Sequence, residues 1–286
     1  MTKVRIATRG SRLALAQANR VADLLRSRVG VDEVELLEVQ TLGDRDRTSS
    51  LTGLTEVGAF VRAVQEAVLD GRADLAVHSL KDLPVSPMHG LELVAFPERR
   101  SPRDVLIGVT LDGLASGSLV GTSSPRRAAQ LTELRPDLRP VPIRGNVDTR
   151  LAKVATGSPA AAILAEAGLE RLGREDAVAE RFHTERMVPA PGQGALAVEA
   201  ALGTAGAELG AQLDDPSLRP LLDAERLLLA ETGAGCRSAL GALAEWDGRK
   251  MRLTCFVSDE RGSRRAVVSG ESPEEIVAGA REELGL

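Results

Sequence analysis

The sequence predicts about two or three compact domains, mostly of α/β type, with a small α+β region at the end of the chain. Three observations support this prediction. The chain has 286 residues, which is too long for one small domain. Short apolar runs that are typical of buried strands alternate with segments of helical periodicity. Near the end of the chain this alternation stops, and neighbouring strand patterns are flanked by helices.

The first part of the chain alternates between strand and helix patterns. Residues 4–8 predict a short buried strand, and Ser11 after it is the expected N-cap of a helix. Residues 34–39 and 75–77 predict two further strands, and the helix between them is expected to end at Gly71. Because strands and helices alternate, we expect a mostly parallel sheet with helices on its faces.

The same pattern restarts after Pro102. Strand patterns occur at residues 119–120, 141–144 and 160–165, and Ser124 is the expected N-cap of another helix. The end of the chain predicts an α+β region, with a helix at 221–229, a glycine-rich cysteine loop, antiparallel strands at 252–257 and 265–268, and a helix from Pro273.

The composition argues against several classes of protein. The formal net charge is −5, so no general attraction to nucleic acid or to anionic membranes is expected. No apolar run approaches the roughly 18 residues of a membrane helix, and the first residues do not resemble a secretory signal. Two cysteines do not make a disulfide framework, and no cysteine–histidine pair has metal-ligand spacing. A cytoplasmic protein without a metal, membrane or nucleic-acid partner is expected.

Four loops that follow predicted strands combine serine, threonine or glycine with arginine or lysine. They are residues 8–11, 78–82, 121–127 and 144–150. Backbone N–H groups at a helix start attract anions, and the planar guanidinium group fits a carboxylate or phosphate. One such arginine alone is more often solvated or capping. Four loops in equivalent places predict a cleft between two similar domains that holds a multiply anionic molecule.

Two further residues do not fit a simple anion site. Asp82 places a carboxylate beside Lys81, where a lone aspartate is usually a cap or an ion-pair partner. Among cationic groups it could instead stabilise a cation that forms during a reaction, or transfer a proton. Cys236 follows a Gly-Ala-Gly run, which is a poor place to bury a side chain, whereas Cys255 lies in a strand pattern and is expected to be buried.

Six segments, in this order, resemble the porphobilinogen deaminase (hydroxymethylbilane synthase) family. They are RIATRGSRLALAQA (5–18), RADLAVHSLKDLP (72–84), VGTSSPRRAAQL (120–131), PIRGNVDTRL (142–151), PAPGQGALAVE (189–199) and GAGC (233–236). The resemblance covers nearly the whole chain, and six matches in order are highly specific. It implies two α/β domains similar to type II periplasmic binding proteins and a small α+β C-terminal domain. The implied division is 1–95 with 190–212, then 96–189, then 213–286.

The resemblance also implies an activity. The family consists of transferases of tetrapyrrole (haem and porphyrin) biosynthesis that deaminate porphobilinogen and join four molecules head to tail. Growth starts on a covalent dipyrromethane cofactor, and hydrolysis then releases linear hydroxymethylbilane. By position, the cofactor is expected to be attached by a thioether to Cys236. A cytoplasmic monomer is the family expectation.

The resemblance assigns the catalytic role to Asp82, which would stabilise cationic pyrroles and help to transfer protons. The residues that match cofactor-binding positions are Cys236, Lys81, Ser79, Thr122, Ser123, Ser124, Arg126, Arg127, Arg144, Gly145 and Asp44. The residues that match substrate-binding positions are Arg9, Ser11, Phe60, Arg144, Asn146, Arg150, Arg171 and Gln193.

The sequence departs from the family in two places. Thr55 and Glu56 stand where many members have a glycine pair, in a loop that the family uses as a lid. After the cysteine, the run to Ala239 and Leu240 lacks the usual proline. Two alternatives therefore stay open, namely a diverged paralogue in a secondary pathway and a non-catalytic module that binds an anionic ligand. Asp82, Cys236 and the third domain favour the enzyme.

Overall fold

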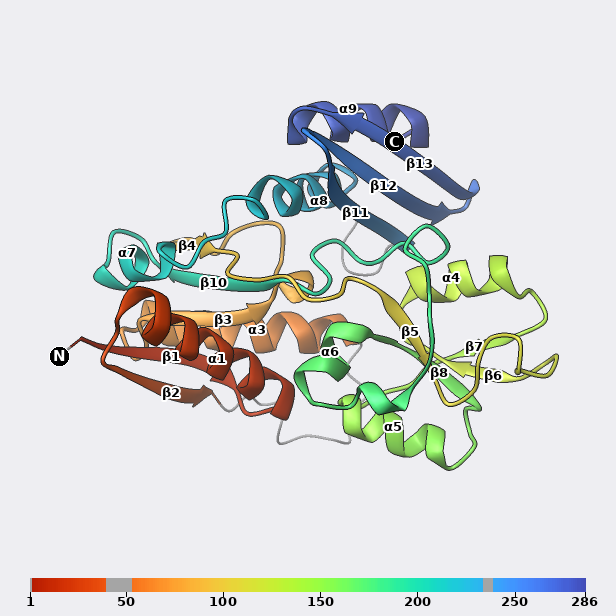
Figure 1. Ribbon diagram of the computed structural model, residues 1–286, viewed down its shortest axis with the longest axis horizontal. Coiled ribbons are helices and arrows are strands. Elements are labelled where there is room, and N and C mark those ends of the chain that lie inside the picture. The colour runs from red at the N-terminus through yellow and green to blue at the C-terminus, as the bar shows by residue number, and fades with distance from the viewer. Residues whose placement is uncertain (1, 40–52, 234–238) are drawn as a thin grey trace. The chain divides into compact units, whose positions relative to one another are not determined.

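The computed structural model describes residues 2–39, 53–233 and 239–286, and for residues 53–60 it describes the backbone only (Figure 1). The chain divides into two compact units. The first consists of Met1–Arg99 and Ala195–Arg219, and the second of Arg100–Gly194 and Pro220–Leu286. The division into three domains stays a prediction.

The first unit is built on a five-stranded sheet of order β2-β1-β3-β10-β4. The strands are β1 (Lys3–Arg9), β2 (Glu33–Val39), β3 (Leu75–Ser79), β4 (Leu91–Ala95) and β10 (Leu196–Ala201). β1 runs parallel to β2 and β3, whereas β10 runs antiparallel to β3 and β4. The central pairing of β10 therefore joins the two stretches of chain that make up this unit.

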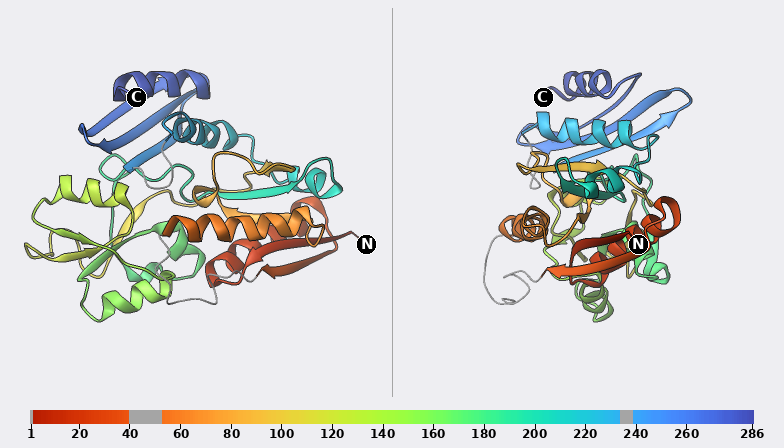
Figure 2. Two further views of the ribbon diagram at one scale, coloured as in Figure 1. Left: turned by 180° about the vertical axis from the view of Figure 1, so that it is seen from behind. Right: turned by 90° about the vertical axis from the view of Figure 1, so that its left-hand side faces the viewer.

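Helices cover both faces of this sheet. They are α1 (Arg12–Leu24), continued by the π-helix η1 (Leu25–Val29), α3 (Gly53–Leu69), the 3-10 turn η2 (Leu80–Asp82) and α7 (Ala205–Ala211). Ile6, Leu75 and Val198 pack with α1 on one face, whereas the alternate residues Ala7 and Ala76 pack with α3 on the other. Figure 2 shows α3 running along its face of the sheet.

The second unit contains a sheet of order β7-β6-β8-β5-β9, which repeats the topology of the first. The strands are β5 (Asp104–Ile107), β6 (Leu119–Gly121), β7 (Arg139–Val141), β8 (Ala161–Ala165) and β9 (Val178–Arg181). The helices are α4 (Pro125–Leu134), α5 (Val147–Ala155) and α6 (Glu166–Arg171), with the 3-10 turn η3 (Glu175–Ala177). β6 lies between two parallel neighbours, as β1 does, and β5 takes the antiparallel place of β10.

A small antiparallel sheet completes the second unit, with the order β11-β12-β13. Its strands are β11 (Ala239–Asp247), β12 (Lys250–Asp259) and β13 (Gly262–Gly270), and its helices are α8 (Arg219–Glu231) and α9 (Pro273–Leu284). Both helices share an apolar core with the sheet, and α9 lies over β12 and β13 (Figure 2). The predicted fold class, two α/β parts and a small α+β part, is confirmed.

No helix within the described ranges combines the length and the apolar character that a membrane crossing needs.

Candidate functional site

In the first unit, the predicted residues gather where two adjacent parallel strands end. Because β1 pairs with β3 in parallel, Arg9 at the end of β1 and Ser79 at the end of β3 lie at the same edge of the sheet. Ser11 is the N-cap of α1, as expected, and its Oγ accepts a hydrogen bond from the backbone N–H of Ala14. The buried Gln17 of α1 donates from Nε2 to Ser79 Oγ at 2.7 Å. Gln17, which the sequence analysis missed, therefore ties α1 to the turn after β3.

Asp82 ends the 3-10 turn that follows β3, and both Lys81 and Asp82 are half-buried. The turn is anchored by the buried side chains of Leu80 and Leu83 and by a hydrogen bond from Leu80 N–H to the Ala195 carbonyl. Within the described part of the chain, no hydrogen bond or ion pair involves the Asp82 carboxylate. The backbone thus fixes Asp82 while its carboxylate is left available to a ligand.

A buried polar cluster supports the opposite face of β3. His78 Nε2 lies 3.2 Å from Glu199 Oε2, and Gln65 Nε2 donates to both oxygens of the Glu199 carboxylate at 3.1 and 2.9 Å. These three residues come from β3, β10 and α3, respectively. The cluster therefore holds the strand that carries the Ser79–Asp82 turn against its neighbour in the sheet and against the helix below it.

In the second unit, a serine joins the loops that follow β6 and β7. Ser123 Oγ donates to the Ile143 carbonyl at 2.9 Å and accepts from Ile143 N–H at 3.2 Å. Thr122 is buried, and Ser124 Oγ caps α4 by accepting from the backbone N–H of Arg127. Both predicted loops thus meet at the carboxyl ends of parallel strands, as expected.

The loop before α5 is built around a glycine. Gly145 has φ +112°, and an added Cβ would lie 2.6 Å from the Thr149 side chain, so only glycine fits there. Asn146 Oδ1 caps α5 by accepting from Thr149 N–H at 2.9 Å, and Arg150 Nε donates to the Gly145 carbonyl at 2.8 Å. The Arg144 side chain is exposed. This loop therefore presents Arg144 on a rigid backbone.

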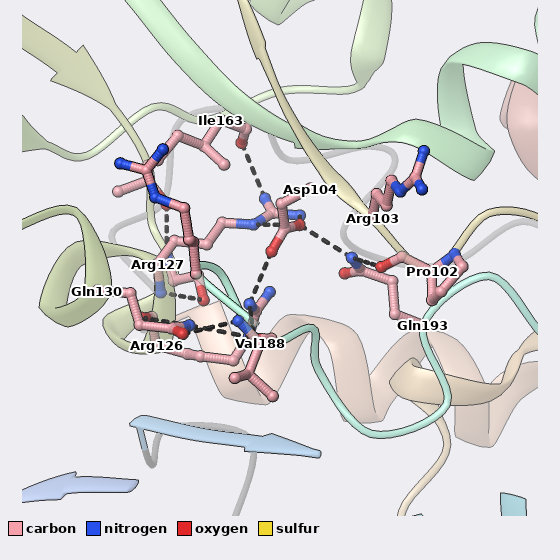
Figure 3. Close-up of polar contacts among 12 residues, drawn as sticks. Pro102, Arg103, Asp104, Arg126, Arg127, Gln130, Ile163, Val188 and Gln193 are labelled. Carbon is pink, nitrogen blue, oxygen red and sulfur yellow. Dashed lines mark hydrogen bonds and ion pairs between the residues drawn. The ribbon is translucent and has the colours of Figure 1, made fainter. Parts of the chain in front are cut away.

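Arg126 and Arg127 differ from the expectation of open ligand-binding arginines, because both are buried on a carboxylate (Figure 3). Arg127 Nε and Nη2 donate to Asp104 Oδ1 at 3.0 and 2.7 Å, and its Nη1 donates to the Ile163 carbonyl at 2.9 Å. Arg126 Nη1 donates to Asp104 Oδ2 at 2.7 Å. Burial alone would raise the pKa of the Asp104 carboxyl, but these two arginines hold it well below its usual value.

Two glutamines connect this cluster to the segment after residue 186. Gln193 Nε2 donates to Asp104 Oδ1 at 2.9 Å and to the Pro102 carbonyl at 2.6 Å (Figure 3). Gln130 both donates to the Val188 carbonyl and accepts from its N–H, at 3.1 and 2.7 Å. Arg171 Nη2 donates to the Gly194 carbonyl at 2.7 Å.

Asp104 itself was not predicted as a site residue. The available signal was an aspartate that opens the apolar run Val-Leu-Ile, because a buried carboxylate needs cationic partners.

Three predicted site residues, Cys236, Asp44 and the side chain of Phe60, lie outside the described residues, as do Thr55 and Glu56 beyond their backbone. Cys255 is buried in β12, and burial raises the pKa of its thiol to about 12. Its expected structural role is confirmed. Within the described residues, no group of three histidine, cysteine or acidic side chains is arranged to hold a metal ion.

Comparison with known proteins places this geometry in a family. The family model described as "Porphobilinogen deaminase, dipyromethane cofactor binding domain" matches residues 4–207. The porphobilinogen deaminase of Thermobifida fusca (strain YX) is 45% identical over 288 residues, which cover 97% of this chain and 89% of the relative. The porphobilinogen deaminase of Mycobacterium marinum is 48% identical over 246 residues, which cover 85% and 77%.

Among solved structures, the unliganded L-cystine solute receptor of Neisseria gonorrhoeae is similar at a TM-score of 0.43 and 12% identity, over 81% of this chain and 89% of the receptor. This distant likeness bears on neither ligand nor activity. The family model and the two relatives each span most of the chain, and their shared description is the same. The chain therefore belongs to the porphobilinogen deaminase family.

Proposed function

We propose that this chain is a hydroxymethylbilane synthase, a transferase of tetrapyrrole biosynthesis that joins four porphobilinogen molecules into linear hydroxymethylbilane. The observation that carries the proposal is the family match over residues 4–207. The position of Asp82 supports it, because a carboxylate without a partner in the described structure stands at the end of β3, beside Lys81.

The substrate's charge explains the arginine-bearing loops. Porphobilinogen carries an acetate and a propionate, so every unit added to the chain brings two carboxylates. Arginine at a strand end or a helix start binds such groups through charge-assisted hydrogen bonds. The residues proposed to bind substrate are Arg9, Ser11, Phe60, Arg144, Asn146, Arg150, Arg171 and Gln193.

The residues also suit a dipyrromethane cofactor. The buried guanidinium groups of Arg126 and Arg127 share one carboxylate, that of Asp104, so positive charge remains there for a carboxylate of the cofactor. The residues proposed to hold the cofactor are Lys81, Ser79, Thr122, Ser123, Ser124, Arg126, Arg127, Arg144, Gly145 and Asp44, with a thioether to Cys236. When bound, the cofactor supplies a pyrrole carbon that starts chain growth.

Asp82 is proposed as the catalytic residue. Loss of ammonia from porphobilinogen produces a cation, and a fixed carboxylate beside that cation lowers its energy. The same carboxylate is placed to accept and return protons as each carbon–carbon bond forms. The turn Leu80–Asp82, anchored by its buried leucines, keeps the carboxylate in place without using it in a structural bond among the described residues. The net charge of −5 agrees with a small-molecule enzyme of the cytoplasm, acting as a monomer without nucleic acid.

The intact mass of the purified chain, measured with and without porphobilinogen, tests the proposal. We expect a mass increase of two pyrrole units in the protein as purified, further steps of one unit with substrate, and free hydroxymethylbilane in solution. A chain that never gains mass would overturn the proposal in favour of a binding module. A chain that gains mass but releases a product of another length would indicate the diverged paralogue, whose altered lid residues are Thr55 and Glu56.

A further inference from the structure

The buried ionic cluster of the second unit contains two cations and one anion. Arg126 and Arg127 are 3% and 7% exposed, and Asp104 is not exposed at all. Arginine stays protonated in proteins, and Asp104 is ionised because the arginines lower the pKa of its carboxyl. Among the described residues, no other acidic side chain pairs with either guanidinium group. The cluster therefore carries one net positive charge, which is unfavourable in a buried position.

Arg127 is fully engaged in the fold. Its Nε and Nη2 bind Asp104 Oδ1, and its Nη1 binds the Ile163 carbonyl of β8 (Figure 3). Each of its three nitrogens thus donates to a buried acceptor. Removing this side chain would leave the Ile163 carbonyl without that donor and would remove two charge-assisted hydrogen bonds from Asp104.

Arg126, in contrast, uses only one of its three nitrogens. Its Nη1 donates to Asp104 Oδ2 at 2.7 Å and to the Val188 carbonyl at 2.5 Å. Its Nε and Nη2 donate to no described residue. The Val188 carbonyl also accepts from Gln130 Nε2, so it does not depend on Arg126. Burial, together with repulsion by Arg127, lowers the pKa of Arg126 despite the opposing charge of Asp104.

We propose that the two arginines have different roles: Arg127 and Asp104 form a neutral structural pair, and Arg126 holds the remaining charge for a single ligand carboxylate. Its Nε and Nη2 form one edge of the guanidinium group, which fits a carboxylate through two parallel hydrogen bonds. Asp104 is a positioning residue that fixes Nη1 of Arg126 and leaves this edge to the ligand. The inference rests on the proposed function, in which the carboxylate belongs to the dipyrromethane cofactor.

Thermal unfolding of full-length chains produced without porphobilinogen separates the two roles. We expect Arg126→Gln to unfold within about 2 °C of the wild type, because the neutral Arg127–Asp104 pair is kept. Arg127→Gln is its matched control and is expected to unfold at a temperature lower by on the order of 10 °C, as is Asp104→Asn, which leaves two buried cations. Arg126→Gln falling as far as Arg127→Gln would overturn the division of roles.

A second measurement uses sodium acetate as the carboxylate probe, against sodium chloride at equal ionic strength. Acetate should raise the unfolding temperature of the unloaded wild type, because a ligand that binds only the folded state stabilises it. Arg126→Gln should not respond, whereas Asp104→Glu, which keeps the carboxylate, should respond as the wild type does. A response in Arg126→Gln equal to that of the wild type would contradict the proposal.

Intact mass after exposure to porphobilinogen completes the test. We expect Arg126→Gln to lack the pyrrole adduct and folded Arg127→Gln chains to carry it. If the wild type also gains no pyrrole mass, the proposed function fails while the acetate result still stands. If Arg126→Gln gains the same mass as the wild type, the function stands and the role assigned to Arg126 is wrong.

Discussion

Gln17 Nε2 donates a 2.7 Å hydrogen bond to Ser79 Oγ and so connects the first helix to the turn that ends at Asp82. Both residues lie at the strand ends where the proposed substrate groups gather. The bond belongs to the fold of the first unit, but it positions a residue that is two places from the proposed catalytic turn. This relationship leads to the first prediction.

Gln17→Leu should lower turnover by roughly tenfold, because a loosened turn misplaces the carboxylate that follows it. Its free energy of unfolding should fall by about 1–3 kcal/mol, since a buried hydroxyl loses its partner. Steady-state kinetics and urea denaturation provide the two values. Asn19→Leu, an exposed position on the same helix, is the control. Equal turnover in both variants would show that the Gln17–Ser79 bond has no catalytic importance.

Asp82→Asn should reduce the rate of hydroxymethylbilane formation by at least about a hundredfold, because the charge that stabilises the cationic intermediate is removed. Stability should stay within about 0.5 kcal/mol of the wild type, since the carboxylate makes no hydrogen bond or ion pair to any described residue. Product formation and thermal unfolding are measured on the same preparation. An active Asp82→Asn enzyme would exclude Asp82 from the mechanism.

Cys236→Ser should abolish the covalent adduct, which intact-mass measurement detects directly. Cys255→Ala is the matched control and should keep it, because Cys255 is buried and its thiol, with a pKa of about 12, is almost entirely protonated at neutral pH. An adduct that survives in Cys236→Ser and disappears in Cys255→Ala would exchange the two assignments.

Asp259 should make stability depend on pH at the C-terminal end of the chain. Hydrogen bonds from Arg264 and from the Arg261 backbone hold the pKa of Asp259 well below its usual value. The same arginines donate to the carbonyls of Leu284 and Gly285, where α9 ends. Because this pKa is lowered in the folded state, the stabilisation is complete above about pH 4–5 and is lost as the pH falls through the folded-state pKa.

Asp259→Asn should therefore be less stable than the wild type at pH 7, and the difference should shrink steadily below about pH 4. Denaturation midpoints measured from pH 7 to pH 2 give this profile. Asp247→Asn, at an exposed strand end, should run parallel to the wild type throughout. A difference that stays constant with pH would show that the ionisation of Asp259 does not stabilise the fold.

The parts of the fold that depend on local sequence were predicted well. Ser11 and Ser124 cap helices as expected, because a serine before an apolar periodic segment satisfies the free N–H groups of the first turn. The loops that contain Arg9 and Ser123 follow parallel strands, as their position after short apolar runs indicated. These features are fixed by residues a few positions apart.

Features that depend on distant residues were missed. β10 pairs with β3 across more than a hundred positions of sequence, and nothing within its own segment identifies that partner. The strand predicted at residues 141–144 is instead β7 at Arg139–Val141, because Ile143 bonds to Ser123 in place of a neighbouring strand. The sequence also could not separate buried from exposed arginines: Arg126 needed Asp104 to be seen beside it, whereas Arg144 is open to solvent.

The place of β10 in the first sheet has a consequence for the order in which the chain is completed on the ribosome. All five strands of the second α/β sheet lie between residues 104 and 181, so that sheet has its full set before synthesis passes residue 181. The first sheet still lacks β10, which lies between β3 and β4, until residue 201 has been added. The part of the protein that is made first is therefore finished second, and β4 waits for its only sheet partner until most of the chain has been translated.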